Sequence, residues 1–262
     1  MGHILAQLGK VDAIWLVAAA AGCALAVVGS AGSWRSAMSI GGAELSLPNA
    51  TARYGAGSLV NTFVPFRVGD AVRIGLFSRC VPHGHRLLKT GGAFAALGVG
   101  RALVLGVLVL AGALTGAMPL WPAFIALGVG VVALAAAFRW KDLRMPGAWM
   151  IAWIAIAVAG RLAAATAIGY SLGISHPLAA ATVVVPALDL AGLVPLTPGN
   201  IGIASSAIAL ALRSEGVSFA HGLAAGIAFH AVDIAVGLAI GTASLLWLGA
   251  GRVKVCTGAI RS

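Results

Sequence analysis

The chain has 262 residues, of which 60% are hydrophobic and only 9% are charged, and its mean hydropathy is +1.01. So much apolar surface exceeds what one globular core could bury, whereas several bilayer-spanning helices would place it in lipid. The net charge of +10 would suggest nucleic acid as the partner of a soluble chain. Here, however, the basic residues lie in short loops between apolar runs, where they act as topology signals. The composition therefore predicts a polytopic membrane protein and excludes nucleic-acid binding.

Five apolar runs have the length of about 20 residues that a helix needs to cross a bilayer. They cover residues 12–33, 92–114, 119–138, 148–168 and 222–248. Two further stretches, 50–80 and 178–213, are apolar but are interrupted at "VPFRVGD" and "LTPGNIG", where proline and glycine disfavour a continuous helix. The sequence thus predicts an all-α, polytopic inner-membrane bundle with two broken or re-entrant helical hairpins.

Loop charges orient this bundle. The loop after the first broken stretch contains Arg73, Arg79, Arg86 and Lys89 without an acidic residue, and the tail after residue 251 is also basic. The loops near 115–121 and 169–177 contain no Lys, Arg, Asp or Glu. By the positive-inside rule, the basic loops are cytoplasmic. We therefore expect a multi-pass protein of the cell inner membrane with its N-terminus outside and its C-terminus in the cytoplasm.

The two halves of the chain resemble each other at an offset of 133 residues. Pro65 falls on Pro198 and Gly69 on Gly202, so both breaks follow the pattern P-x-x-[aliphatic]-G, and the first span falls on 145–166. These matches predict one transmembrane domain over residues 1–262, made of two inverted repeats. The repeats cover about 12–114 and 145–248, and the helix at 119–138 connects them.

The two breaks predict a shared polar cavity. Non-helical backbone in a bilayer leaves polar groups without partners unless protein or a water-filled cavity covers them. Helices that restart after Gly69 and Gly202 would direct free amides and positive dipole ends into such a cavity, which suits an anion. The alternative is that the breaks are kinks required only for packing.

Ionisable residues within the spans point to the same region. Arg101 lies about nine residues into its span, or ~14 Å at ~1.5 Å per residue, which is near the membrane midplane. With a loop four residues shorter in the second half, His230 falls opposite Arg101. Charges at this depth are costly, so we expect them to be paired or functional. The structural alternative is an internal ion pair, such as Arg101 with Asp189 or Arg161 with Asp233.

Two motifs resemble those of the lysylphosphatidylglycerol synthase transmembrane, or flippase-like, family. "NTFVPFRVGDAVRIGLFSR" at 61–79 is similar to the family stretch N-x-x-x-P-x-R-x-G-[DE] with basic residues after it. "LVPLTPGNIGIASSAIALALRSEGVS" at 193–218 is similar to P-x-T-P-G-G-x-G-x-x-E followed by G-V-S. The resemblance covers about residues 12–248 and implies movement of lipids or lipid-linked sugars between leaflets. The sequence shows no counterpart of the family's aminoacyl-transfer catalytic domain.

The chain departs from the family pattern at four positions. Asn200 replaces the second glycine, Ser205 replaces a glutamate, His230 replaces an arginine, and Gly100 replaces the acidic residue before Arg101. These departures predict a changed headgroup preference or a loss of transport.

The residues expected to bind substrate combine the matching motif positions with the deep ionisable groups. In the family resemblance, Arg67 and Arg73 meet a headgroup of the cytoplasmic leaflet, and Arg101 supplies charge deeper in the cavity. The full set is Asn61, Arg67, Gly69, Asp70, Arg73, Arg101, Thr197, Pro198, Gly199, Asn200, Gly202 and His230.

The leading hypothesis is a lipid translocase that moves an anionic phospholipid or a polyprenyl-phosphate-linked glycan by alternating access, without covalent chemistry. The alternatives are a small-solute or ion carrier and a non-transporting accessory subunit of an envelope glycosyltransferase. The sequence contains no H-E-x-x-H, no G-x-S-x-G and no Asp-rich metal motif, so we expect no catalytic residue, metal or cofactor. Cys23, Cys80 and Cys256 are widely scattered and suggest neither a disulfide nor a zinc site.

Three structural features separate these hypotheses. A lipid translocase needs a lateral opening for acyl or prenyl chains, and a solute carrier needs a closed vestibule. An accessory protein would have dry breaks and buried charges that are all paired internally.

Overall fold

A computed structural model describes residues 12–64, 66, 68–81, 85–114, 124, 128, 144–192 and 201–250. The described residues are helical and contain no β-strand. The helices within these residues are α2 (Ala13–Ile40), α3 (Leu47–Phe63), α4 (Val68–Ser78), α5 (Arg86–Leu114), α7 (Arg144–Ser171), α8 (Pro177–Ala191), α9 (Ile201–Arg213) and α10 (Phe219–Gly249).

Four of the five predicted spans are confirmed as long apolar helices. The helices α2, α5, α7 and α10 are each long and apolar enough to cross a membrane. The fifth predicted span, 119–138, lies outside the described residues except for two isolated positions. The protein is therefore a multi-pass, all-helical membrane protein.

Local chemistry sets several helix ends. The Asp12 carboxylate accepts a hydrogen bond from the Ile14 amide at the start of α2, and the Ser218 hydroxyl accepts one from the His221 amide at the start of α10. Such side chains satisfy amides that have no partner within the helix. Gly42 follows α2 with a φ of +82°, a conformation that glycine adopts without strain.

Each broken stretch forms two helices that pack against each other. Arg53 of α3 contacts the Leu76 carbonyl of α4, and Asn61 contacts Gly69, so these two helices are antiparallel. Between them, Phe66 has a φ of 62°, in the left-handed region that is costly for a bulky residue. The helices α8 and α9 form the corresponding hairpin in the second half. Residues 193–200, which contain most of the predicted break, lie outside the described residues.

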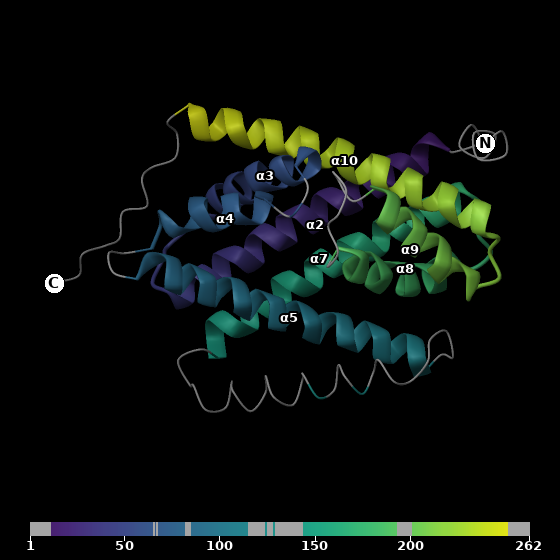
Figure 1. The fold of residues 1–262 in the computed structure, drawn as a ribbon, viewed down its shortest axis with the longest axis horizontal. Helices are drawn as coiled ribbons and strands as arrows, with labels where there is room; N and C mark the ends of the chain where they lie inside the picture. The colour runs from purple at the N-terminus through teal and green to yellow at the C-terminus, as the bar shows by residue number, and fades with distance from the viewer. Residues whose placement is uncertain are drawn as a thin grey trace.

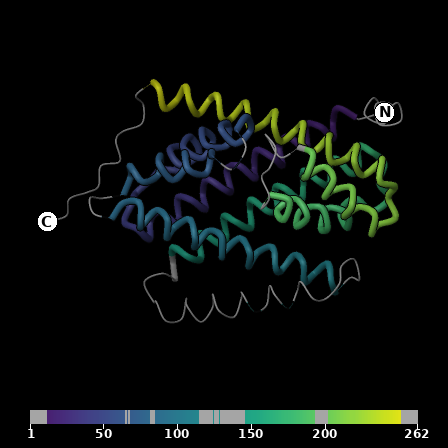
Figure 2. Tube along the Cα trace, in the orientation of Figure 1, coloured from purple at the N-terminus to yellow at the C-terminus, as the bar shows by residue number. Residues whose placement is uncertain are grey.

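The two hairpins enter the bundle from opposite ends (Figure 1). The α3–α4 hairpin starts at the left end of the view and the α8–α9 hairpin at the right end, and each is directed toward the middle. The helices α10 and α5 lie along opposite sides, and α2 and α7 pass between them, as the trace in Figure 2 also shows.

The centre of the fold is the contact between α2 and α7. A Cβ atom on Gly22 would lie 2.7 Å from backbone atoms of Gly160 and Ala164, and one on Gly29 would lie 2.6 Å from the backbone of Ala157. Only glycine permits so close an approach, which is how helices commonly associate in lipid. The residue order shows that α2 and α7 are antiparallel.

The helix contacts occur in corresponding sets. Exchanging α2, α3, α4 and α5 with α7, α8, α9 and α10 turns every extensive contact into another extensive contact. Thus α2–α3 corresponds to α7–α8, α3–α4 to α8–α9, α4–α5 to α9–α10, α2–α5 to α7–α10, α2–α10 to α5–α7, and α3–α10 to α5–α8.

The cysteines differ from expectation at one position. Cys80, just after α4, is disulfide-bonded, so the prediction of no disulfide is wrong, whereas Cys23 is free and buried. Wide spacing in a sequence does not keep two cysteines apart in the fold, which is why spacing alone missed this bond.

Candidate functional site: a polar cavity among apolar helices

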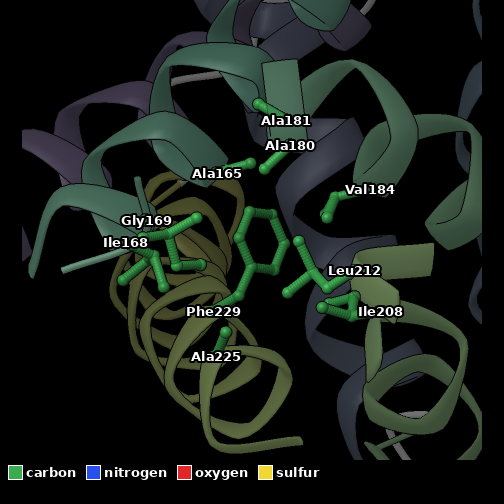
Figure 3. Close-up of a pocket in the computed structure, with 11 residues that line it drawn as sticks. Ala165, Ile168, Gly169, Ala180, Ala181, Val184, Ile208, Leu212, Ala225 and Phe229 are labelled. Atoms are coloured by element: carbon green, nitrogen blue, oxygen red, sulfur yellow. The ribbon is translucent and has the colours of Figure 1, made fainter. Parts of the chain in front are cut away.

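Two cavities among the described residues differ in their linings. The smaller has about 20 Å³ of space, and every residue around it is apolar. Figure 3 shows the Phe229 ring of α10 projecting between Ala165 of α7 and Leu212 of α9. A dry space of this size holds about one water molecule at most, so it is a packing gap and not a ligand site.

The larger cavity has about 190 Å³ of space and a polar lining. Five helices, α2, α3, α4, α7 and α10, contribute to it. Its polar side chains are Ser30, Tyr54, Ser58, Asn61, Thr62, Arg73, Arg161, His230 and Asp233. A concave site with convergent polar groups in an otherwise apolar bundle is the best candidate for ligand binding.

Arg73 is fixed on the α3–α4 side of this cavity. Its Nη1 donates to the Asp70 carboxylate at 2.5 Å, and its Nη2 donates to the Ser58 hydroxyl at 2.7 Å. The guanidinium carbon lies 4.1 Å from the centre of the Tyr54 ring, within the range of a cation–π contact. Neighbouring groups on α3 and α4 thus orient the Arg73 cation in the cavity lining.

Asn61 closes the turn of the first hairpin. Its side-chain oxygen accepts a hydrogen bond of 2.7 Å from the Gly69 amide, and its nitrogen lies 3.4 Å from the Asp70 carboxylate. A Cβ atom on Gly69 would lie 2.1 Å from the Gly57 carbonyl oxygen, so only glycine fits. The Gly69 amide is therefore already bonded to Asn61 and is not a free donor for an anion.

Arg161 joins the cavity to a partly buried ion cluster. Its Nη1 donates to Asp189 Oδ1 at 2.6 Å, and Arg101 donates to the same oxygen. The expected ion pair of Arg101 with Asp189 is confirmed. The expected pair of Arg161 with Asp233 is wrong, because Arg161 pairs with Asp189. The three residues lie on α7, α8 and α5 and link these helices.

The predicted site residues fall into three groups. Asn61, Arg73 and His230 line the cavity, and Gly69 and Asp70 lie directly behind Asn61 and Arg73. Arg101 and Gly202 are not among the lining residues, although Arg101 reaches the cavity indirectly through Asp189 and Arg161. The positions outside the described residues are Arg67, Thr197, Pro198, Gly199 and Asn200.

Sequence reasoning missed six polar lining residues as binding residues: Arg161 and Asp233, which it considered only as an ion pair, and Ser30, Tyr54, Ser58 and Thr62. The last three recur at a spacing of four residues in α3, which places them on one face of the helix. A polar stripe at this spacing, directly before the first break, is the signal that could have identified them.

These features define a multi-pass helical membrane protein with a polar, arginine-containing cavity. Residues 1–146 match the family described as the lysylphosphatidylglycerol synthase TM region. The match covers more than half of the chain, and the protein therefore belongs to this family, as the motif resemblance predicted. It includes α2 to α5 but not the second hairpin. No curated protein matches the chain.

Proposed function

We propose that the protein is a lipid translocase that moves an anionic phospholipid or a polyprenyl-phosphate-linked glycan between leaflets. The observation that carries this proposal is the polar cavity of about 190 Å³ with Arg73 and Arg161 in its lining. Guanidinium groups bind phosphate through paired hydrogen bonds, and a low-dielectric surrounding strengthens this contact. No covalent step is needed, so the protein acts as a transporter and not as an enzyme.

The arrangement of the helices supports two inverted repeats that could alternate around this cavity. Every extensive helix contact has its counterpart when the two sets of four helices are exchanged. In addition, the offset of 133 residues places Val27 on Gly160, and Gly160 packs directly against Gly22 and Ala26. The pseudo-symmetry axis would therefore pass through the closest contact between α2 and α7.

The charges at the two ends of the bundle support the proposed orientation. The end where α2 meets α3 and α4 meets α5 contains Arg35, Arg79, Arg86 and Lys89. The opposite end contains the uncharged loop 172–176 and the balanced pair of Arg213 and Glu215. The basic end is then cytoplasmic in the inner membrane, and the hairpins dip into the bilayer from opposite faces.

A second candidate, an accessory subunit without transport, is favoured by the internal pairing of the arginines. Arg73 pairs with Asp70, and Arg101 and Arg161 both pair with Asp189. The two pairs with Asp189 hold helices together without a ligand, and the pair of Arg73 with Asp70 lies within α4. The size and polar lining of the cavity favour the translocase, because a scaffold gains nothing from polar space inside its core.

Lipid movement in vesicles separates the two candidates. The purified protein is reconstituted into phosphatidylcholine vesicles with a fluorescent phosphatidylglycerol in both leaflets, and external dithionite destroys the fluorophores that it reaches. We expect fluorescence to fall well below the half that protein-free vesicles retain, and a fluorescent polyprenyl-phosphate sugar tests the glycan alternative. The matched variants are Arg161→Gln and Arg213→Gln. Arg161→Gln should lose only the half that protein-free vesicles lose, and Arg213→Gln should lose as much fluorescence as the unmodified protein. Vesicles that keep half of the fluorescence with both probes would contradict transport.

A further inference from the structure

Asp189 occupies a position from which it competes with any anion in the polar cavity. Its side chain is 11% exposed and pairs with Arg161, which lines the cavity, although Asp189 itself does not. We infer that Asp189 is an internal counter-anion, which a phosphate ester entering the cavity replaces on Arg161. This inference rests on the proposed function only in taking the cavity as an anion site.

The hydrogen bonds leave room for such an exchange. Arg101 and Arg161 both donate to Oδ1 of Asp189, and Oδ2 is buried without a hydrogen bond to any described residue. A guanidinium has five N–H donors, and the bond to Asp189 uses one donor of Arg161. The other donors are available for an entering anion to contact Arg161 before it displaces Asp189. Asp189 therefore binds Arg161 through one hydrogen bond and not in a bidentate arrangement.

The charges explain why two arginines are needed. The cluster of Arg101, Arg161 and Asp189 has two positive charges for one negative charge. When a phosphate ester takes Arg161, Asp189 keeps its bond to Arg101. No buried charge is left without a counter-ion, which would be the costly outcome for a simple ion pair. Arg101 thus acts as a positioning residue for Asp189 and does not contact the ligand.

The exchange would also change the links between helices. The bond from Arg161 to Asp189 joins α7 to α8, and the bond from Arg101 to Asp189 joins α5 to α8. Ligand binding removes the first link and keeps the second, so the α8–α9 hairpin becomes less tightly held by α7. The pair of Arg73 and Asp70 lies within α4 and offers no such release. Anion binding is therefore coupled to the second hairpin and not to the first.

The test measures anion binding to the full chain in phosphatidylcholine nanodiscs, with sn-glycerol 3-phosphate as the probe and calorimetry as the readout. Asp189→Asn removes the competing charge, and we expect it to bind the probe about tenfold more tightly. Arg101→Gln makes Arg161 the remaining arginine partner of Asp189, so Asp189 competes more strongly with the probe. We expect about tenfold weaker binding, although Arg101 does not line the cavity. The matched controls are Asp12→Asn and Arg213→Gln, which lie at exposed helix ends and should bind as the unmodified protein does.

A purely structural role for the cluster predicts no change of affinity in folded protein. Unchanged affinity in either folded variant, or no binding by any form, would overturn the inference. If Asp189→Asn does not fold, Arg101→Gln decides the question alone.

Phosphatidylglycerol added to the discs shows the source of the anion. If phosphatidylglycerol competes with the probe, the anion is a lipid headgroup. If it does not compete, the anion is a soluble phosphate ester. Either result supports the exchange. If Asp189→Asn binds the probe more tightly and Arg101→Gln more weakly, but the vesicle assay shows no lipid movement, transport is contradicted and the exchange is not.

Discussion

The two hairpins hold their charged groups in different ways. In the α3–α4 hairpin, Arg73 pairs with Asp70 on the same helix, and Asn61 bonds to the next helix across the turn. In the α8–α9 hairpin, Asp189 is held by arginines from α5 and α7, outside the hairpin. The charged pair of the first hairpin is therefore internal, whereas that of the second depends on neighbouring helices. A structural change that moves α8 must break the ion pairs to α5 and α7, whereas one that moves α4 with α3 keeps the pair of Arg73 and Asp70 and breaks the packing of α3 against α2 and α10.

The largest expected effect comes from filling the tight contact in the first hairpin. Gly69→Val would place a branched side chain against the Gly57 carbonyl, 2.1 Å from the position of its Cβ atom. Because the obstacle is backbone, we expect a loss of roughly 3 kcal/mol or more in stability. The aligned variant Gly202→Val is the control, since no described atom lies within 4 Å of a Cβ atom there. Thermal unfolding in detergent gives the comparison, and equal losses would contradict the difference between the hairpins.

The next effect concerns the two aspartates. Asp189→Ala leaves two half-buried arginines without their shared counter-ion, and we expect it to destabilise the protein by about 2 kcal/mol, less than for a fully buried pair. Asp70→Ala leaves Arg73 its bond to Ser58 and its contact with Tyr54, so we expect about 1 kcal/mol. Chemical or thermal unfolding of both variants under one condition measures the difference. A larger loss for Asp70→Ala would show that the local pair is the more important one.

The smallest expected effect is at the turn of the first hairpin. Asn61→Ala removes the acceptor for the Gly69 amide, which resembles the loss of a helix cap, and we expect about 1 kcal/mol. Asn61→Asp keeps an acceptor but places a second carboxylate near Asp70, so we expect only partial recovery. Unfolding midpoints in the same detergent test this order. Full stability in Asn61→Ala would mean that the hairpin turn does not depend on this bond.

The sequence predicted most of the fold because apolar length and helix breakers act locally. The four long helices and both interruptions follow from the runs and from residues such as Pro65 and Gly69. The position of Arg101 within a span was also predictable, but its absence from the cavity lining was not, because this depends on how α5 packs against its neighbours. Likewise, the choice of Asp189 over Asp233 as the partner of Arg161 depends on where α7 and α8 cross.

Two indications of orientation disagree. Disulfides are rare in the reducing cytoplasm, so the bonded Cys80 would favour the outside for its end of the bundle. The basic residues Arg79, Arg86 and Lys89 surround the same loop and favour the cytoplasm. We give more weight to the basic residues, because several charges in one short loop determine orientation during insertion and a single bond between thiols forms afterwards.

Cysteine accessibility tests the central claim, that the two hairpins enter the membrane from opposite faces, most directly. In a variant without native cysteines, Glu44→Cys marks the exposed loop before α3, and Ser175→Cys marks the exposed loop before α8. A membrane-impermeant maleimide is added to intact cells and, in parallel, to permeabilised cells. We predict that Ser175→Cys is labelled in intact cells and that Glu44→Cys is labelled only after permeabilisation. Labelling of both positions from the same side would contradict the opposed hairpins and, with them, the inverted repeat on which alternating access depends.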